Sequence, residues 1–394
     1  MVDPEARDEQ PWFTVDGNRM RLLVSGQDRL EALIALIEGA RRSLRILFYI
    51  YADDEAGRRV RAALEAARRR GVAVTIIIDG FGSEVAKDES FFSALEAAGG
   101  SVCRFQPRFG RRYLLRNHQK LALADAEEAE ARVITGGFNV EDDYFGQSAE
   151  GNWRDLGIEI EGPAAARISR YFDALNDWSH TPKAKIRVLR RALREASETE
   201  GDVRWLLGGP TARLSPWAKC LRQDLRNARR IDMIAAYFAP GPRLLRRIDH
   251  AAKQGDVRLI TAAKSDNTVT IEAARFTYRG LLKKGVRIFE YQPTKLHTKL
   301  YLTDDIVHIG SANFDMRSLF VNLEIMVRIA NPALARHVHA YFERECESSE
   351  EITADLHRSR MTLWTRIRQF GAYLVIAVID VNVSRRLAFG LDGK

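Results

Sequence analysis

The sequence is poor in cysteine. Cys103, Cys220 and Cys346 are the only three in 394 residues, and they form no Cys-x-x-Cys pair and no Cys/His cluster. We therefore expect neither a disulfide scaffold nor a zinc ribbon. Residues 1–13 are acidic and polar and lack the basic start and apolar run of a secretory signal, so we expect a cytoplasmic, reducing location.

Long hydrophobic runs are also scarce. The apolar stretch from Phe370 to Ile379 has ten residues, whereas a bilayer span needs about 20. From Arg358 to Arg386 there are six arginines, Trp364 and one acidic residue, Asp380. Such a segment can lie in a membrane interface; the alternative is a C-terminal helix packed on the protein's own core or on a second subunit.

Acidic residues are outnumbered by basic ones. Lysine and arginine total 61 against 53 aspartate and glutamate, which gives a net charge of +8 and a pI near 9.4. The excess favours a polyanionic partner, either nucleic acid or an anionic lipid surface. With 29% charged and 46% hydrophobic residues, the composition is that of a folded chain, and its length suits two domains.

What the sequence does contain is one short motif in two copies. His118 begins His-Gln-Lys-Leu-Ala-Leu-Ala-Asp, and His297 begins His-Thr-Lys-Leu-Tyr-Leu-Thr-Asp. Each copy is followed by a turn of small residues that ends in asparagine, at Asn139 and Asn313. One copy would be a weak signal, but two copies with matching flanks indicate an internal repeat.

The residue types of the motif suit phosphoryl chemistry. On a strand, residues two apart share a face, so each histidine projects beside the lysine of its own motif. A neutral imidazole can act as nucleophile or general base, while an ammonium and an amide donate to anionic oxygen. A second histidine allows one ring to attack phosphorus and the other to protonate the leaving alcohol. This scheme requires neither a metal nor a cofactor.

The paired H-x-K-x4-D motifs resemble the signature of the phospholipase D superfamily. The flanking runs, which resemble bacterial cardiolipin synthases, are Gly136 to Asn139, Trp153-Arg154-Asp155, Glu161-Gly162-Pro163 and Gly310 to Ser318. The resemblance covers roughly residues 20 to 350. It implies an α/β fold of two pseudo-symmetric α/β/α repeats that pack about a pseudo-twofold axis and share one active site.

Alternating strand and helix patterns support two repeats. Ser43 to Tyr51 and Val72 to Asp79 are predicted buried strands around a helix at Gly57 to Arg70, and Ile231 to Phe238 and Val257 to Ala262 match the two strands. We expect β-α-β units and a largely parallel sheet. The expected domains are a polar leader (1–20), a first repeat (21–185), a charged linker (186–202), a second repeat (203–350) and a basic, apolar tail (351–394).

By the resemblance, His118 and His297 face each other across a phosphodiester. His118 is the expected nucleophile and His297 the acid and later the base, although the sequence leaves the reverse order open. The two close imidazoles are expected to titrate as a coupled pair. The residues expected to hold the nonbridging oxygens are Lys120, Lys299, Asn139 and Asn313.

Further residues are expected to support this site. Asp155 and Glu324 match the family positions of the carboxylates that orient the imidazoles, and Asp125 and Asp304 are expected to be structural ion-pair partners. The small residues expected to let the backbone approach the phosphate are Gly136, Gly137, Gly310 and Ser311.

Two further segments could meet the substrate. The first motif is preceded by an insertion that is basic and aromatic, with Phe109, Arg111, Arg112 and Tyr113. It either overhangs the site or is a solvated loop. The turn at Asp142 and Asp143, beside Tyr144, either contacts a headgroup or is likewise a solvated turn.

The leading hypothesis is a phosphatidyltransferase that passes a phosphatidyl group through a phosphohistidine to an alcohol such as phosphatidylglycerol. Its expected partners are phospholipid substrates and the anionic membrane surface, at the inner face of the cell membrane. The chain shows no N-terminal transmembrane helices, which many bacterial cardiolipin synthases carry. A hydrolytic phospholipase D is the near alternative, a nuclease is less favoured, and a silent binding protein is disfavoured by the intact motifs. The oligomeric state is left open.

Overall fold

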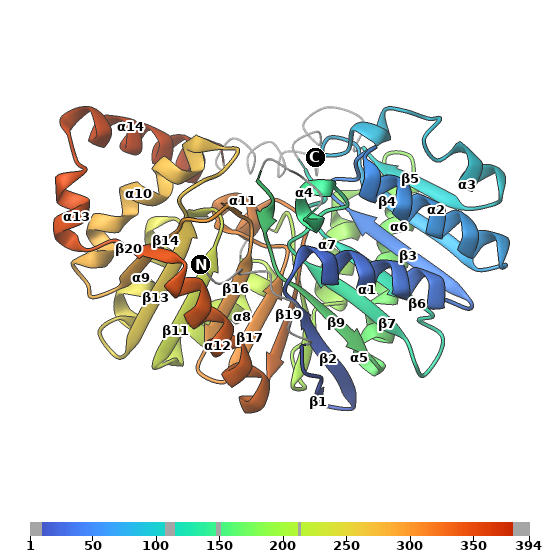
Figure 1. Cartoon of the computed structure of the whole chain (residues 1–394), viewed down its shortest axis with the longest axis horizontal. Helices are drawn as coiled ribbons and strands as arrows, with labels where there is room; N and C mark the ends of the chain where they lie inside the picture. The colour runs from blue at the N-terminus through green and yellow to red at the C-terminus, as the bar shows by residue number, and fades with distance from the viewer. Residues whose placement is uncertain (1–9, 107–114, 147–150, 212–213, 381–394) are drawn as a thin grey trace.

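The computed structural model describes residues 10–106, 115–146, 151–211 and 214–380. Its two halves lie side by side, the first in blue to green on the right and the second in yellow to red on the left (Figure 1). Each half contains one eight-stranded sheet with helices packed on it. The two-repeat α/β fold expected from the duplicated motif is confirmed.

The first sheet has the order β1-β2-β9-β7-β6-β3-β4-β5. Its strands, in chain order, are β1 (Phe13–Val15), β2 (Asn18–Leu23), β3 (Ser43–Phe48), β4 (Ala73–Asp79), β5 (Ser101–Phe105), β6 (Leu121–Ala124), β7 (Arg132–Gly136) and β9 (Gly157–Glu161). Strand β6 directly follows the first His-x-Lys motif, so the motif lies at the end of a central strand.

The second sheet has the order β10-β19-β17-β16-β11-β13-β14-β20. Its strands are β10 (Val203–Gly208), β11 (Arg230–Ala235), β13 (Asp256–Ala262), β14 (Arg287–Tyr291), β16 (Lys299–Thr303), β17 (Ile306–Gly310), β19 (Glu324–Ala330) and β20 (Ser349–Glu351). Seven strands in each sheet follow the same order, and each half adds one edge strand of its own, β1 or β20.

The expected largely parallel sheet is wrong. In the first half β3, β4 and β5 are parallel, but β6 pairs antiparallel with both β3 and β7, and β7 and β2 pair antiparallel with β9. The second half has the same mixture. Part of the reason is local: β6 is joined to β7 by residues 125–131 and β16 to β17 by residues 304–305, and connections this short join only antiparallel neighbours.

Helices cover both faces of the two sheets. Those of the first half are α1 (Gly26–Gly39), α2 (Glu55–Arg69), α3 (Ser93–Ala97), α4 (Asp142–Phe145), α5 (Pro163–Arg167), α6 (Ser169–His180) and α7 (Ile186–Glu195). Those that follow are α8 (Pro216–Asn227), α9 (Pro242–Ala251), α10 (Thr268–Leu282), α11 (Met316–Phe320), α12 (Pro332–Glu347), α13 (Ala354–Ser359) and α14 (Leu363–Tyr373).

The apolar core has three main parts. One lies between the first sheet and α1 to α3, and a second between the other sheet and α8 to α10. The third joins the halves, because side chains of both sheets, α5 to α7 and α12 belong to one buried cluster. A buried ion pair also crosses the boundary, with Arg154 Nη2 2.5 Å from Glu345 Oε1. The halves therefore form a continuous interface that can hold a shared site in fixed geometry.

Two of the expected domain limits differ from the folded elements. The segment expected to be a charged linker begins with α7, whose Ile186, Leu189 and Leu193 are buried in the core between the halves. The expected polar leader includes β1 and the start of β2, which form an edge hairpin. In both places the apolar residues are spaced among many charges, so the composition hides the buried face.

The C-terminal segment forms α13, α14 and a π-helical turn at Leu374–Asp380. Helix α14 packs on α10 along one side (Figure 1). Within the described ranges, no helix is both long enough and apolar enough to cross a membrane.

Candidate active site

The two motifs meet at the boundary between the halves through matched backbone pairing. His118 N donates to Leu323 O at 3.0 Å, and His297 N donates to Arg154 O at 2.8 Å. The second contact extends a short parallel pairing of β15 (Lys295–Leu296) with β8 (Trp153–Arg154). Leu323 is followed by Glu324, and Arg154 is followed by Asp155. Each histidine is therefore hydrogen-bonded to the residue just before a carboxylate of the other half.

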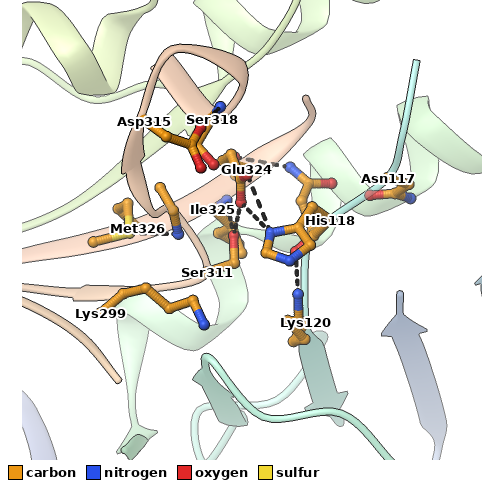
Figure 2. Close-up of polar contacts among 12 residues, drawn as sticks. Asn117, His118, Lys120, Lys299, Ser311, Asp315, Ser318, Glu324, Ile325 and Met326 are labelled. Carbon is orange, nitrogen blue, oxygen red and sulfur yellow. Dashed lines mark hydrogen bonds and ion pairs between the residues drawn. The ribbon is translucent and has the colours of Figure 1, made fainter. Parts of the chain in front are cut away.

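The two carboxylates face the histidines across the boundary. Nδ1 of His118 lies 3.0 Å from Glu324 Oε2, and Nδ1 of His297 lies 2.6 Å from Asp155 Oδ2. Figure 2 shows the first pair, with Ser311 beside the same carboxylate. A carboxylate at Nδ1 holds the proton there and directs the lone pair at Nε2 toward the substrate. The sequence predicted both carboxylates, but it did not predict that each one pairs with the histidine of the opposite half.

Each motif lysine is hydrogen-bonded to the backbone of the histidine in its own motif. Lys120 Nζ donates to His118 O at 2.7 Å, and Lys299 Nζ donates to His297 O. Their amino groups lie on the same side of His118 in Figure 2, although they come from different halves. Both lysine side chains are buried. The site thus brings two cations together out of water, which suits an anionic ligand.

Both asparagines are buried as well. Asn139 Oδ1 accepts from Ile50 N at 3.1 Å, so the amide NH₂ is the part of this side chain that can donate. Asn313 Oδ1 is buried and has no hydrogen-bond partner among the described residues. The amide of Asn313 therefore has unused hydrogen-bonding capacity in a buried site.

Burial and nearby positive charge favour the neutral form of both imidazoles. Burial lowers the pKa of His297 to about 3, with Lys299 adding to the effect and Asp155 opposing it. The pKa of His118 is also lowered well below its ordinary value, by burial and then by Lys120 and Lys299. The lysines of both halves lower the pKa of each ring, so the protonation states of the four side chains depend on one another. An entering phosphodiester would offset the lysines and favour a protonated ring.

The lysines and the two carboxylates are shifted as well. Burial lowers the pKa of Lys299 to about 8, and it also lowers the pKa of Lys120 well below its ordinary value. Burial raises the pKa of Glu324 to about 7, against the opposing charge of Lys120. For Asp155 burial acts in the same upward direction, but His297 and Lys299 outweigh it and lower its pKa. Asp155 is therefore ionised at neutral pH, while Glu324 is only partly ionised.

This difference predicts a pH-dependent step. If ionised Glu324 must orient His118, kcat/KM should rise with pH through a midpoint near 7. The Glu324→Gln variant should be slower at high pH and should lack this rise, because glutamine does not titrate. A pH series of initial rates checks this. A variant that keeps the same midpoint would assign the titration to another group.

The small residues expected to let the backbone approach the phosphate also lie in close contact with the protein's own atoms. A Cβ on Gly137 would lie 2.4 Å from Asp155 Oδ1, and one on Gly136 would lie 2.5 Å from Leu156 O. At Gly310 a Cβ would lie 2.2 Å from Ile325 O. Ser311 Oγ donates to Glu324 and accepts from Ile325 N. Smallness at these positions makes room for the carboxylates and the strands that carry them.

Gly137→Ala should therefore disturb Asp155. We expect the substitution to lower the free energy of unfolding by about 1–3 kcal/mol, because the new methyl group overlaps the carboxylate, and to reduce turnover strongly. Gly280→Ala is the matched control, since a Cβ there meets nothing within 4 Å and the site is an exposed helix position. Urea unfolding and initial rates measure both. Equal stability of the two variants would contradict the proposed packing.

The last residue of each motif, Asp125 or Asp304, lies away from the reacting centre. Asp125 accepts hydrogen bonds from the backbone N–H groups of residues 41, 42 and 43, and Asp304 from those of residues 229 and 230. Both have positive φ, 51° and 53°. Among the described residues these partners are backbone amides, which differs from the ion pairs expected. The aspartates fix the turn between a helix and the central strand of each half.

The structure adds aromatic neighbours that the repeat comparison missed. Tyr49 lies edge-on to His118, with ring centroids 5.1 Å apart, and Tyr144 and Trp153 lie 5.2 and 5.3 Å from His297. Tyr237 is 6.5 Å from His297. The strand registers match Tyr49 with Ala236, so no tyrosine occurs at the equivalent position of the second half. These rings line the site with apolar surface.

Arg29 is a second residue missed from the sequence. It is buried on α1 and donates to Tyr144 O at 2.8 Å and to Asp155 O at 2.6 Å. It therefore holds the backbone that carries Asp155. An arginine on the apolar face of a predicted helix was the available signal.

The turn after the first asparagine is tied to the protein. Asp142 accepts from Ala56 N at 2.7 Å, Asp143 pairs with Lys295 at 2.7 Å, and Tyr144 is buried. The turn is therefore neither purely solvated nor shown to contact a ligand. The insertion with Phe109, Arg111, Arg112 and Tyr113 lies outside the described residues.

Two buried imidazoles, each oriented by a carboxylate from the opposite repeat and flanked by two lysines, form a site whose residue types suit phosphoryl chemistry. Comparison with known proteins gives the same class. The chain matches the family described as "Cardiolipin synthase, PLD-like domain" over residues 33–176 and 221–346. It is 31% identical over 353 residues to cardiolipin synthase 1 of Bacillus cereus. The aligned region covers 86% of this chain and 68% of that protein.

A second relative is the cardiolipin synthase of Listeria innocua, 30% identical over 374 residues, covering 92% of this chain and 76% of that protein. The chain belongs to the cardiolipin synthase PLD-like domain family. It is accordingly a phosphatidyltransferase-type enzyme of the phospholipase D superfamily.

Solved structures support the fold. A phosphatidylserine synthase of Haemophilus influenzae superposes with a TM-score of 0.71 at 12% identity, covering 96% of this chain and 97% of that chain. A polyphosphate kinase of Porphyromonas gingivalis gives 0.58 at 14% identity, covering 96% of this chain and 53% of that chain. At such low identity these likenesses establish the arrangement of two repeats and nothing about the substrate.

Proposed function

We propose that the protein synthesises cardiolipin-like lipids by passing a phosphatidyl group through a phosphohistidine to the hydroxyl of phosphatidylglycerol. The observation that carries the proposal is the reciprocal pairing of His118 with Glu324 and of His297 with Asp155. It gives two equivalent rings fixed Nε2 positions in one buried site. One ring can then attack while the other handles the proton.

In the first step His118 is the nucleophile. Its Nε2 lone pair attacks phosphorus, a P–N bond forms, and the bond from phosphorus to the headgroup glycerol oxygen breaks. His297, protonated in the presence of the anionic substrate, gives its proton to that oxygen, and glycerol leaves. The His118 side chain is 12% exposed and that of His297 6%. The more accessible ring suits direct attack, which favours this order over its reverse.

In the second step the roles of His297 are reversed. It is now neutral and removes the proton from the hydroxyl of a second phosphatidylglycerol as that oxygen attacks phosphorus. The P–N bond breaks, His118 is regenerated as a neutral ring, and the new phosphodiester leaves. His297 ends protonated, as it began. The ionised Asp155 stabilises the imidazolium at both ends of the cycle.

Negative charge on the nonbridging oxygens is held by Lys120, Lys299 and the amides of Asn139 and Asn313. These donors are buried before the substrate arrives, so little reorganisation is needed as the charge develops. The lysines are the stronger pair because they are cationic. Each lysine is hydrogen-bonded to the backbone of its own histidine, which supports a role for both at the phosphorus rather than at one end of the lipid.

Water is the competing acceptor, and the aromatic lining opposes it. Tyr49, Tyr144, Trp153 and Tyr237 surround the imidazoles with apolar surface. A dry site lets a lipid hydroxyl compete with water for the phosphohistidine. The anionic membrane surface, at the inner face of the cell membrane, would supply both phosphatidylglycerol molecules, and it suits the net charge of +8 better than a soluble substrate does.

The test is lipid product analysis by mass spectrometry. Purified protein with EDTA is incubated with phosphatidylglycerol vesicles, beside a His118→Ala control. Cardiolipin and glycerol, both lost in the control, would support the proposal. Phosphatidic acid would mean that water is the acceptor and the enzyme is a hydrolytic phospholipase D. No product would refute phosphatidylglycerol as donor and would direct the search to other lipids and then to DNA.

A further inference from the structure

The C-terminal helix exposes a row of large apolar side chains. Trp364 is 78% exposed, and the side chains exposed along the same row are Leu363, Ile367, Phe370, Leu374 and Val375. Their spacing of three and four residues places them on one face of α14 and the turn after it. A folded protein rarely leaves such a continuous apolar face in water. We call these six residues the apolar row.

The opposite face of the helix is packed on the protein. Tyr373 and Ala377 are buried with Ala239 and Ala273, and Tyr373 Oη donates to Pro240 O at 2.8 Å. The apolar row is therefore not the core-facing side of a helix that has come loose. The helix is anchored through one face and presents the other outward.

The apolar row lies beside positive charge. A groove of about 630 Å³ between α10, α13 and α14 is lined by Phe276, Leu282 and Phe370, and its cations are Arg279, Lys283, Arg358 and Arg366. Arg358 pairs with Asp355. In the described part of the chain, no carboxylate lies within ion-pair distance of the other three cations. Apolar surface bordered by unpaired cations is complementary to an anionic lipid surface.

The apolar row also lies at the same end of the molecule as the active site. The turn that carries Leu374 and Val375 contacts α11, which begins at Met316, directly after the strand that follows Asn313. Helices α4, α11 and α14 all lie along the upper side in Figure 1. From the first half, Phe81 adds an exposed ring at 67%, with the guanidinium of Arg116 3.8 Å from its centroid, beside the first motif.

We propose that the apolar row and the basic groove dock the enzyme on an anionic bilayer, with α14 lying in the interface beside the entrance to the active site. The inference rests on the proposed phosphatidyl transfer for the identity of the lipid. Docking of this kind would deliver both lipid substrates to the buried phosphate site.

The test compares the double variant Ile367→Glu/Phe370→Glu with Val188→Glu. Val188 is 53% exposed and Ile367 52%, but Val188 is on α7, away from the apolar row. In sedimentation with vesicles of phosphatidylcholine and phosphatidylglycerol, the double variant should bind at least about tenfold more weakly than the wild type, because two inserted side chains become charged. Val188→Glu should bind like the wild type.

Activity on dissolved short-chain phosphatidylglycerol separates this inference from the proposed function. The double variant should keep that activity and lose activity on vesicles. If the wild type makes no product from either form but still binds vesicles through this face, the proposed function fails and docking stands. Equal vesicle binding by all three proteins would overturn docking. Docking would also be overturned if the only effect of the double substitution were a change from dimer to monomer in light scattering, because the face would then bind a second copy of the chain.

Trp364 provides an independent readout. Insertion should shift its emission to shorter wavelength when phosphatidylglycerol vesicles are added, and Trp364→Phe should remove that shift. A shift that persists in Trp364→Phe would place the contact elsewhere and overturn the inference.

Discussion

His297→Gln should form the covalent intermediate once and then stall. With phosphatidyl-para-nitrophenol as donor, the leaving group needs no proton, so attack by His118 does not require His297. We expect one equivalent of nitrophenol per enzyme, after which turnover is slower by about 10⁴-fold because no base activates the acceptor. His118→Gln should release no burst. Stopped-flow absorbance measures the burst, and mass spectrometry of the denatured protein detects the attached phosphatidyl group.

The controls make this comparison decisive. His308 is also buried and pairs with a carboxylate, Asp224, at 2.8 Å, but this pair joins β17 to α8 and includes neither motif histidine nor the carboxylate of either one. His308→Gln should therefore keep both the burst and the turnover. A burst from His118→Gln and none from His297→Gln would reverse the two roles. A burst from neither variant would argue against a covalent route through these rings.

Asp155→Asn should have the second largest effect. Asp155 is ionised despite burial, because His297 and Lys299 lower its pKa, and it lies 2.6 Å from His297 Nδ1. A neutral amide can no longer stabilise the imidazolium, and it can fix the wrong tautomer. We expect kcat to fall by about 10³–10⁴-fold, with little change in the KM for lipid. Steady-state kinetics with phosphatidylglycerol measures both constants.

Because Asp155 acts through His297, the nitrophenol burst should survive in Asp155→Asn while the later turnover is lost. Asp224→Asn is the matched control, since it removes the carboxylate behind a histidine outside the site. Loss of the burst together with a lower unfolding midpoint would show that Asp155 supports the fold rather than the proton transfer. Loss of turnover in Asp224→Asn to the same degree would have the same meaning.

Much of the site could be predicted because its signals are local. His118 and Lys120 recur at the same spacing as His297 and Lys299, and an asparagine follows each histidine after 21 or 16 residues. Residues two apart on a strand share a face whatever surrounds them. The same locality explains the errors. The order of strands in a sheet depends on which connections are hairpins, and the buried face of α7 is hidden among arginines, so a largely parallel sheet and a charged linker were expected.

The sequence by itself determined that there are two repeats, which residues are the candidates for the chemistry, and that the tail is both apolar and basic. Only the tertiary structure decided that Glu324 serves His118 and Asp155 serves His297, that Gly137 makes room for a carboxylate, and that one face of α14 remains exposed. The paired histidines and carboxylates are 206 and 142 residues apart in the chain. Contacts over such separations arise from the packing of whole sheets, and no local pattern of residues encodes them.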